Sequence, residues 1–361
     1  MPTKIAWFVA LGLVLAACTG TPEPLTLATS PTTTPATPTT SAPTVEPTTT
    51  TAEATTTTVP GTLSLLNGTP VQDPTLLDRH VLAVKMDNHP KATPQSGVEF
   101  ADAVIELRVE GITRFITLWH ESDADYLGPM RSGRPTDAHL LPAFNEPTFA
   151  ISGAQAWVQG LIRSQDIHLI GEVRPATFRV SGRSAPHNLY VDTNLLREVA
   201  ASRGHSNEPP AGPIWEFGPM PDSAEEVTSV TMDFRGNIVT WDWHPVVSSW
   251  RRTAYGEQSK TRTQDGRESR IRVPVLVALY VEQYTATPQS GVAGKALPSS
   301  EVTGEGKAFV FADGKVVEGT WTRETDTDWF TLTDVNGEFL LVPPGKVWIS
   351  LVPNTTGLTF E

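Results

Sequence analysis

A run of 42 residues, 19–60, limits where this 361-residue chain can build a hydrophobic core. It holds 19 Thr and 8 Pro, with three acidic residues and no basic one. Such a composition cannot bury enough apolar surface to offset the entropy lost on folding, so we predict a disordered tether. Proline-rich chains favour polyproline II, in which this tether would reach about 130 Å at roughly 3.1 Å per residue. The folded part is therefore expected from residue 63 onward.

The chain begins with one positive charge, Lys4, and a short apolar segment, Ile5 to Leu15. The segment is too short to span a bilayer and is typical of a secretion signal. Small residues then precede Cys18, and this arrangement resembles the lipobox of bacterial lipoproteins. We predict a signal peptide at residues 1–17, and a lipidated Cys18 as the first residue of the tether at 18–62. The alternative is an ordinary signal peptide with an accidental cysteine.

Cys18 is the only cysteine of the chain, which excludes an intrachain disulfide. If it carries acyl chains, thiol-based mechanisms are excluded as well, and two or three such chains would anchor the protein stably. The formal net charge is −13, and it argues against nucleic acid as a partner. We therefore expect an extracytoplasmic protein, anchored to the bacterial cell membrane through lipidated Cys18.

Helix and strand patterns alternate up to about residue 205. An apolar run ends in the polar sequence Asp87-Asn88-His89-Pro90, which indicates a strand followed by a loop. Pro135 begins a helical pattern at a position where its missing N–H group costs nothing. The expected strands are 81–86, 103–109, 112–119 and 149–152, and the expected helices are 135–144, 154–163 and 193–203. These elements predict an α/β domain at residues 63–212.

The pattern changes after a joint rich in proline and glycine, Asn207 to Pro213. Strand-like runs then alternate with sequences such as Asp313-Gly314 and Asn336-Gly337, which accept the positive φ of hairpin turns. The expected strands are 227–234, 238–243, 273–284, 307–311, 316–323, 329–333 and 347–352. We predict a small, mostly antiparallel β-domain at residues 213–361, and hence an α+β protein.

Seven of the ten tryptophans lie from residue 215 onward. Aromatic side chains are common in strands, so we expect these indoles to pack in the core of the second domain. Stacking on a carbohydrate is the alternative.

Three polar loops carry the residues most suited to chemistry. The first, 87–97, follows a strand end, where ligands of α/β sheets often bind. The second, 128–135, and the third, 181–190, both contain Ser-Gly-Arg, and arginine forks suit carboxylate or phosphate. We expect the loops to bind an anionic ligand. The candidate residues are Arg131, Arg134 and Arg183 for the anion, and Asn88, His89, His187 and Asn188 to orient it.

A structural role is the alternative for each of these residues. The three arginines could bridge carboxylates such as Asp102, Glu106 or Glu110, and the two histidines could cap or pin loops. The signatures of nucleotide enzymes, zincins and common serine hydrolases are absent from the sequence. Asp87, His89 and His187 would make only a partial ligand set without paired spacing, so we expect no metal and no cofactor.

The three loops, in this order, resemble the YerB-like bacterial lipoproteins, a family of two domains of unknown function (DUF3048 and its C-terminal domain). The resemblance rests on 87–90 with 94–97, 109–115, 128–135, 184–189 and, near the end, 314–321 and 344–353. One departure is a single glycine, Gly111, where two are expected before Ile-Thr-Arg-Phe. The resemblance implies a lipid-anchored extracytoplasmic protein with an α/β domain and a β-rich domain. It implies no reaction.

Our leading hypothesis is an envelope protein of unknown biochemical activity that binds an anionic cell-wall or envelope ligand. The alternative is a cell-envelope hydrolase or transferase, with His89 or His187 as general base and Asp87 fixing the imidazole tautomer. A third hypothesis is a scaffold that docks other envelope proteins. The sequence leaves the choice between enzyme and binding protein open. Convergence of the candidate residues in one site would favour the first two hypotheses.

Overall fold

The structure is a computed structural model that describes residues 62–361. The predicted signal peptide, Cys18 and the tether up to residue 61 lie outside the described residues. Residues 62–361 belong to one compact unit. Within the described part, no helix has both the length and the apolar character that crossing a membrane requires.

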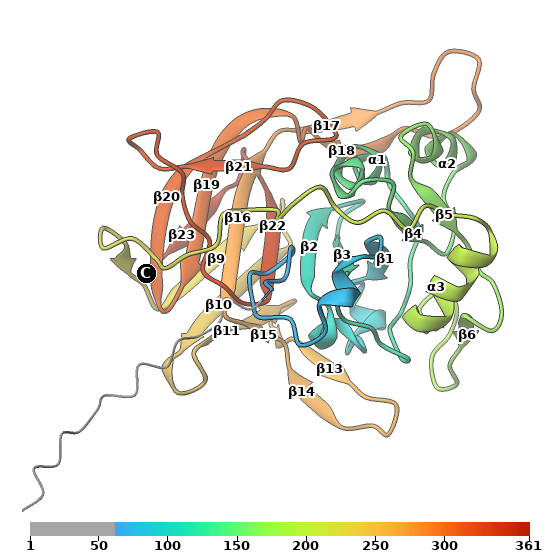
Figure 1. Ribbon diagram of the computed structural model, residues 1–361, viewed down its shortest axis with the longest axis horizontal. Helices are drawn as coiled ribbons and strands as arrows, with labels where there is room; N and C mark the ends of the chain where they lie inside the picture. Colours follow the sequence, from blue (N-terminus) through green and yellow to red (C-terminus); the bar gives the residue numbers. More distant parts are fainter. Residues whose placement is uncertain (1–61) are drawn as a thin grey trace, which may run out of the picture. The chain divides into compact units, whose positions relative to one another are not determined.

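One large mixed sheet dominates residues 62–361 (Figure 1). It has eleven strands in this part of the chain. Ten follow one another in the order β21 (Thr331–Thr333), β20 (Lys315–Arg323), β19 (Gly304–Ala312), β16 (Val275–Val281), β22 (Val347–Pro353), β2 (Ala103–Arg108), β3 (Thr113–Trp119), β1 (Leu82–Asp87), β4 (Thr148–Ala150) and β5 (His168–Ile170). The short β8 (Glu225–Glu226) pairs with β20.

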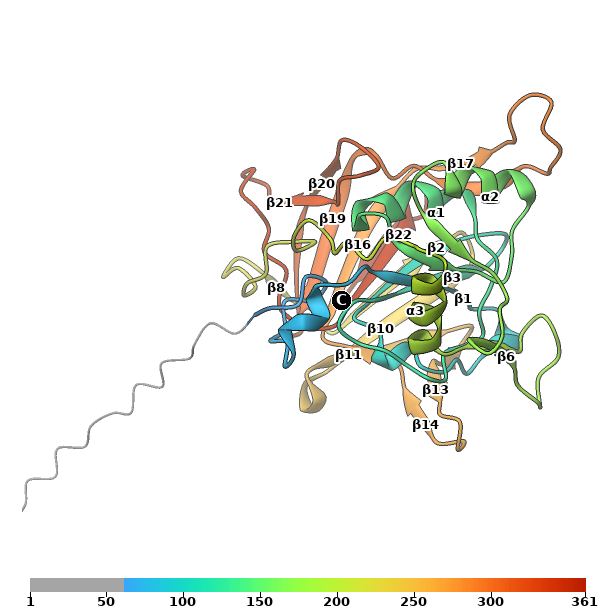
Figure 2. The same ribbon diagram turned by 45° about the vertical axis from the view of Figure 1, so that its right-hand side comes forward.

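The strand β22 joins the two halves of the chain at the centre of this sheet (Figure 2). It runs parallel to β16 and also parallel to β2, and Val347 is in register with Val275 on one side and Ala103 on the other. The sheet therefore contains strands from both sides of the expected domain boundary between residues 212 and 213. The boundary stays a prediction. The second half pairs mostly antiparallel, as expected, and β22 is the exception, because this strand is parallel to both neighbours.

A second sheet and three two-stranded ribbons complete the fold. The second sheet contains β12 (Glu257–Gln258), β11 (Ser249–Ala254), β10 (Ile238–His244), β9 (Ser229–Asp233) and β23 (Leu358–Phe360), with β15 (Arg272–Val273) beside β11. Two-stranded ribbons are formed by β13 (Lys260–Arg262) with β14 (Glu268–Arg270), by β17 (Gln283–Ala286) with β18 (Leu297–Ser300), and by β6 (Thr177–Arg179) with β7 (Leu189–Val191). Figure 1 shows the ribbon of β13 and β14 projecting from the body.

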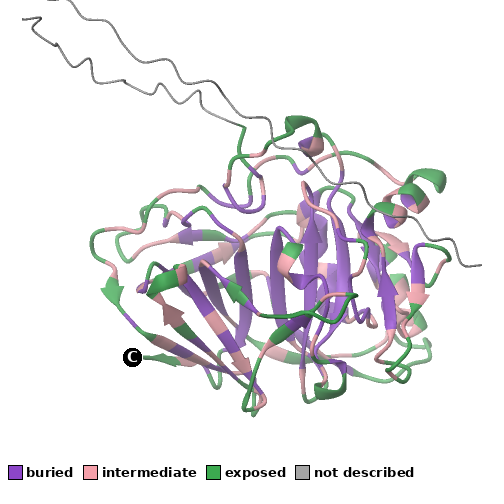
Figure 3. Ribbon diagram, turned by 90° about the horizontal axis from the view of Figure 1, so that it is seen from below, coloured by how far each residue is buried: buried purple, intermediate pink, exposed green. Residues whose placement is uncertain are grey.

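The large sheet has a hydrophobic core on each face, because its side chains alternate in direction. The first core includes residues of α1 (Pro135–Leu140) and α2 (Ala156–Arg163), two helices that pack together. The second core includes α3 (Thr193–Ser202) and the second sheet. Both cores contain residues from both halves of the chain. The buried residues in the central strands are visible in Figure 3.

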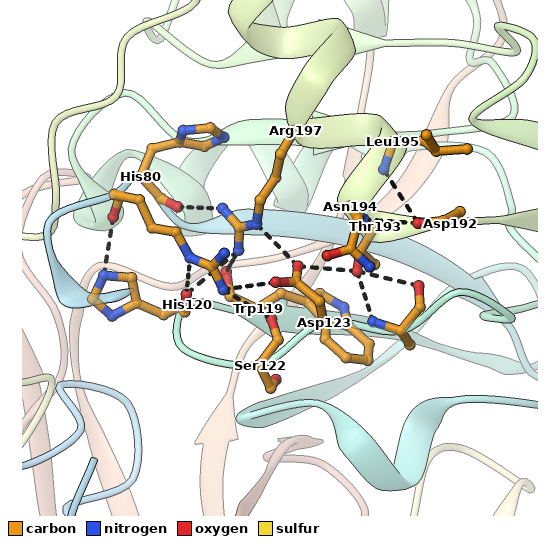
Figure 4. A network of polar contacts seen from close by, with 12 residues as sticks. His80, Trp119, His120, Ser122, Asp123, Asp192, Thr193, Asn194, Leu195 and Arg197 are labelled. Atoms are coloured by element: carbon orange, nitrogen blue, oxygen red, sulfur yellow. Dashed lines mark hydrogen bonds and ion pairs between the residues drawn. The ribbon is translucent and has the colours of Figure 1, made fainter. Parts of the chain in front are cut away.

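The helix α3 is fixed to the sheet by a polar network (Figure 4). Arg197 pairs with Asp123 at 3.0 Å and donates to the backbone carbonyls of His80 and Trp119. Thr193 donates to the same carboxylate at 3.1 Å. The carboxyl of Asp192 accepts from the backbone N–H groups of Asn194 and Leu195 and so caps the start of the helix.

The fold is mostly β, with mixed and antiparallel sheets. The α/β label expected for residues 63–212 fits only loosely, because the helices in this region are few and short. The predicted strands and helices themselves occur within a few residues of their expected positions. None of the seven tryptophans from residue 215 onward is exposed, which confirms that they pack in the protein rather than on its surface.

Candidate functional site

The three polar loops meet at the carboxyl end of β1. Met86, in β1, forms an isolated bridge with Met130 of the second loop. The backbone N–H of Met130 then donates to Leu189 of the third loop. The strands β4 and β5 run parallel to β1 and end at the same edge. The sequence therefore predicted correctly that the first loop follows a strand end, and the fold brings the other two loops to it.

Asp87 is the centre of the site and its side chain is fully buried. Its Oδ2 lies 2.7 Å from Nδ1 of His187 and 3.1 Å from Nε of Arg131. The Arg131 contact is an ion pair whose geometry falls short of a hydrogen bond. The other oxygen, Oδ1, accepts the backbone N–H of His89 at 3.0 Å. We call Asp87, His89, Arg131 and His187 the Asp87 cluster.

The carboxylate orients His187. A carboxylate next to Nδ1 favours the tautomer that carries its proton there, which leaves Nε2 as an acceptor. Within residues 62–361, Nε2 has no hydrogen-bond partner, and the side chain is 12% exposed. A histidine held in this way can accept a proton from a group that approaches from solvent.

His89 packs against His187 but is held differently. The two rings stack with centroids 4.8 Å apart and an interplanar angle of 24°. Nδ1 of His89 accepts the backbone N–H of Lys91 at 3.1 Å, at the start of a short 3-10 helix, Pro90–Ala92. Burial, together with His187, lowers the pKa of His89. This histidine therefore caps a helix, as one of the alternatives from the sequence proposed.

Arg131 presents its outer nitrogens to solvent. Its side chain is 21% exposed, and neither terminal nitrogen has a hydrogen-bond partner in the described part of the chain. The backbone of Arg131 is fixed on both sides, because its N–H donates to Lys85 and its carbonyl accepts from Ser152. The guanidinium is thus positioned, and only its Nε side faces a carboxylate.

Arg114 is a cation of this site that the sequence analysis missed. It lies opposite Asp87 in the pairing of β1 with β3 and is 5% exposed. It donates to the carbonyl of Ser132 at 2.8 Å, but its Nε has no partner, and it forms no ion pair within residues 62–361. Burial, and after it Arg134, lowers the pKa of Arg114 to about 10. An arginine inside an otherwise apolar strand was the available signal.

The charges around the carboxyl end of β1 do not balance. Three ion pairs join Asp87 to Arg131, Lys85 to Asp137 and Arg134 to Glu110. Arg114 adds a fourth cation without a fourth carboxylate. Because a buried charge without a counter-charge is costly, this surplus favours an anion at the site.

Arg134 has the structural role that the sequence left open. Its Nε and Nη2 bind the two oxygens of Glu110 at 3.0 and 2.8 Å. Its backbone N–H donates to Asp137 at the start of α1. Asp137 also binds Lys85 at 2.6 Å, in a pair whose side chains are fully buried. Burial lowers the pKa of Lys85 to about 8, although Asp137 opposes the shift.

Three other candidates shape the loops. Arg183 donates to the backbone carbonyls of Ala92 and Pro94. The side chain of Asn188 donates to the carbonyl of Arg183 at 3.2 Å. The buried Asn88 donates to Thr113 and accepts from Gln95, as the distances of 2.7 and 2.9 Å show. The structure thus unites Asp87, His89, Arg131 and His187, and it engages Asn88, Arg134, Arg183 and Asn188 in contacts around them.

Glu106 was considered as a partner for the candidate arginines, but it binds Arg252 instead. Both side chains are fully buried, and Nη2 of Arg252 lies 2.5 Å from Oε1 of Glu106. Glu106 also accepts from Thr113 at 2.6 Å and from the indole of Trp348 at 3.0 Å. This contact is structural and joins the two halves.

A groove of about 590 Å³ opens next to the first loop. Asn88 and Pro90, the neighbours of His89 in the sequence, line it together with Tyr255 and Lys260 of the second half. The hydroxyl of Tyr255 donates to the carbonyl of Asn88 at 2.7 Å.

Among residues 62–361, no group of three or more His, Cys, Asp or Glu side chains is arranged to hold a metal ion.

The geometry defines a mostly β protein in two halves, with a polar cluster at the carboxyl end of one strand of the first half. The chain belongs to the DUF3048 family of proteins of unknown function. The N-terminal domain of the family matches residues 66–206, and the C-terminal domain matches residues 229–349.

A relative in Bacillus subtilis strain 168, YerB, is 28% identical over 290 residues. The match covers 77% of this chain and 82% of the relative, whose name provisionally classes it as a lipoprotein. A crystal structure of YerB from Bacillus subtilis superposes with a TM-score of 0.71 at 23% identity. That match covers 83% of this chain and 99% of the YerB chain, and it supports the fold.

Proposed function

We propose that this protein is a lipid-anchored extracytoplasmic protein that binds an anionic envelope ligand at the Asp87 cluster. The lipid anchor is supported by the sequence ahead of Cys18 and by the name of the relative YerB. Replacing Cys18 with serine should release the protein from the membrane fraction into the soluble fraction. Retention of the C18S protein in the membrane would contradict this part of the proposal.

The main support for anion binding is the Asp87 carboxylate, which Arg131 and His187 share. Asp87 holds Arg131 and His187 by their inner nitrogens, and the outer nitrogens of both have no partner within residues 62–361. The guanidinium of Arg131, which is positioned from behind and open in front, suits an oxyanion, and Nε2 of His187 can accept a proton from a hydroxyl group of the ligand. A guanidinium presents parallel N–H donors that match the geometry of carboxylate and phosphate oxygens.

The charge surplus supports the same conclusion. Arg114 lies buried next to the cluster with its Nε unpartnered and with no carboxylate of its own. A bound anion would compensate this charge. Because Asp87 is already neutralised by Arg131, a ligand with at least one negative charge is required to balance the site. Phosphate and carboxylate groups both satisfy this requirement.

Isothermal titration of the full chain in detergent with inorganic phosphate, and separately with acetate, tests the proposal. We expect Arg131→Gln to weaken binding at least tenfold, because it removes the charge while keeping a polar side chain. The matched control is Arg163→Gln, an arginine of α2 that is exposed and contacts only Gln159. Equal binding by wild type and R131Q, or no binding of either anion by wild type, would contradict the proposal.

A further inference from the structure

We infer that the Asp87–His187 pair makes the anion site hydrolytic, with phosphate diesters as the substrate class. This inference rests on the proposed anion site, and it adds that the bound group is turned over. It is carried by the geometry of the pair, by the position of Arg131 and by the charge around them. No family assignment contributes to it.

The pair has the arrangement of a general base with its orienting acid. Asp87 is fully buried, and His187 is 12% exposed with Nδ1 2.7 Å from the carboxylate. Burial keeps water away from the carboxylate, so its interaction with a protonated imidazole is stronger than it would be in solvent. Nε2 is the nitrogen that remains for a proton, and it has no partner within the described residues.

His89 does not compete for this role. Its Nδ1 accepts a backbone N–H, and the only contact of His89 with the Asp87 carboxylate is through its own backbone N–H. Its ring instead stacks on that of His187 and limits the directions in which His187 can rotate. The geometry therefore selects His187 as the base, Asp87 as the residue that positions it, and His89 as a packing partner.

Arg131 holds the group that reacts. It shares the oxygen Oδ2 of Asp87 with His187, so the open ends of the two side chains belong to one site. A phosphoryl group bound by the terminal nitrogens of Arg131 would lie beside the imidazole. As negative charge develops on the non-bridging oxygens, Arg131 and the buried Arg114 would stabilise it.

Hydrolysis of the diester needs no co-reactant other than water. A water oxygen attacks phosphorus, and its proton passes to Nε2 of His187 while Asp87 stabilises the imidazolium. The bond from phosphorus to the leaving oxygen breaks, and its electron pair stays on that oxygen. The imidazolium returns the proton to the leaving alkoxide. The products are a phosphate monoester and an alcohol, and His187 is again neutral.

The substrate class follows from the site. A diester carries one negative charge, which matches the one uncompensated arginine, Arg114. The groove lined by Asn88 and Pro90 adjoins His89 in the sequence but is lined by none of the four cluster residues, so it would take only a substituent that extends beyond the bound phosphate. Its wall carries both Lys260 and Glu268, 3.2 Å apart, so it suits a polar substituent rather than a lipid chain.

The test compares two His–Asp pairs of the same chain. In the second pair, His139 of α1 lies 2.7 Å from Asp326, and both side chains are partly exposed, at 30% and 24%. The substrate is bis(4-nitrophenyl) phosphate, and the variants are H187Q and, as control, H139Q. Phosphate binding is measured on the same preparations. For Asp87, the variant D87N keeps the shape and removes the charge, and its folding is checked by thermal unfolding.

We expect hydrolysis by wild type and by H139Q, and a kcat at least 100-fold lower for H187Q, which should still bind phosphate through Arg131. Added imidazole should restore part of the activity of H187A, which a merely structural histidine would not show. Phosphate binding without hydrolysis by wild type, or equal kcat for wild type and H187Q, would overturn this inference alone. Absence of phosphate binding would overturn the proposed anion site as well.

Discussion

Two buried carboxylates of the large sheet, on the two strands that flank β3, have opposite surroundings. Glu106 of β2 is bonded by Arg252, Thr113 and Trp348, and Arg252 is itself 1% exposed and lies over two aromatic rings. Asp87 ends β1 and is equally buried, but its partners Arg131 and His187 reach solvent with unoccupied nitrogens. The first arrangement is closed and holds the fold together, and the second is open toward a ligand.

The largest effect is expected for Arg252→Met. This change leaves the Glu106 carboxylate buried without its cation, which costs about 3–5 kcal/mol in comparable sites. Urea unfolding of the full chain measures the difference. The double variant with Glu106→Gln should recover part of the loss, because no uncompensated charge remains. A loss below about 1 kcal/mol for R252M would show that the Glu106 contact does not hold the halves together.

The second largest effect on stability is expected from a fall in pH. Burial is the largest cause that lowers the pKa of His80, His120 and His205, in each case to about 4. Since a histidine in the unfolded chain titrates near 6.5, the unfolded state binds more protons between these values. The stability from these histidines is therefore present above about pH 6.5 and is lost as the pH falls toward 4.

One carboxyl opposes this trend. Burial raises the pKa of Asp102 to about 7, so its protonation favours the folded state as the pH falls from there toward 4. With three histidines against one carboxyl, we expect a net fall in the melting temperature between pH 7 and pH 4.5. The variant D102N should lose stability more steeply over the same range. A melting temperature that is constant across it would contradict the burial of the neutral histidines.

The smallest effect on stability, and the sharpest contrast with R252M, is expected for Arg114→Met. Arg114 has no carboxylate partner, so its loss leaves no charge unpaired and should change the free energy of unfolding by less than about 1 kcal/mol. Phosphate binding should nevertheless weaken at least tenfold, because the surplus positive charge is gone. A large loss of stability with unchanged binding would place Arg114 with the structural cations instead.

Local sequence patterns predicted many of the elements, although not β11, and they did not predict how the elements are arranged. The helix α3 and the hairpin turn at Asp313-Gly314 depend on neighbouring residues and occur where expected. The position of β22 depends on pairing Val347 with Ala103, which are far apart in the sequence, and no local pattern encodes it. For this reason a sheet shared by both halves was not foreseen.

The sequence indicated which residues could form the candidate site, but not which of their side chains contact one another. The three loops were recognised because arginine, histidine and asparagine gather next to glycine and proline. Arg131 and Arg134 belong to the same loop, and only the fold shows that Arg134 reaches Glu110 while Arg131 reaches Asp87. Arg114 was missed because it lies in a strand whose apolar neighbours indicate a core.

A crystal structure of the protein grown or soaked with phosphate tests the central claim most directly. The account predicts a phosphate ion within hydrogen-bond distance of the terminal nitrogens of Arg131 and of Nε2 of His187, with Asp87 still bound to both side chains from behind. A phosphate-free cluster in which Arg131 has turned onto another protein carboxylate, with His187 Nε2 bonded to the protein, would contradict it.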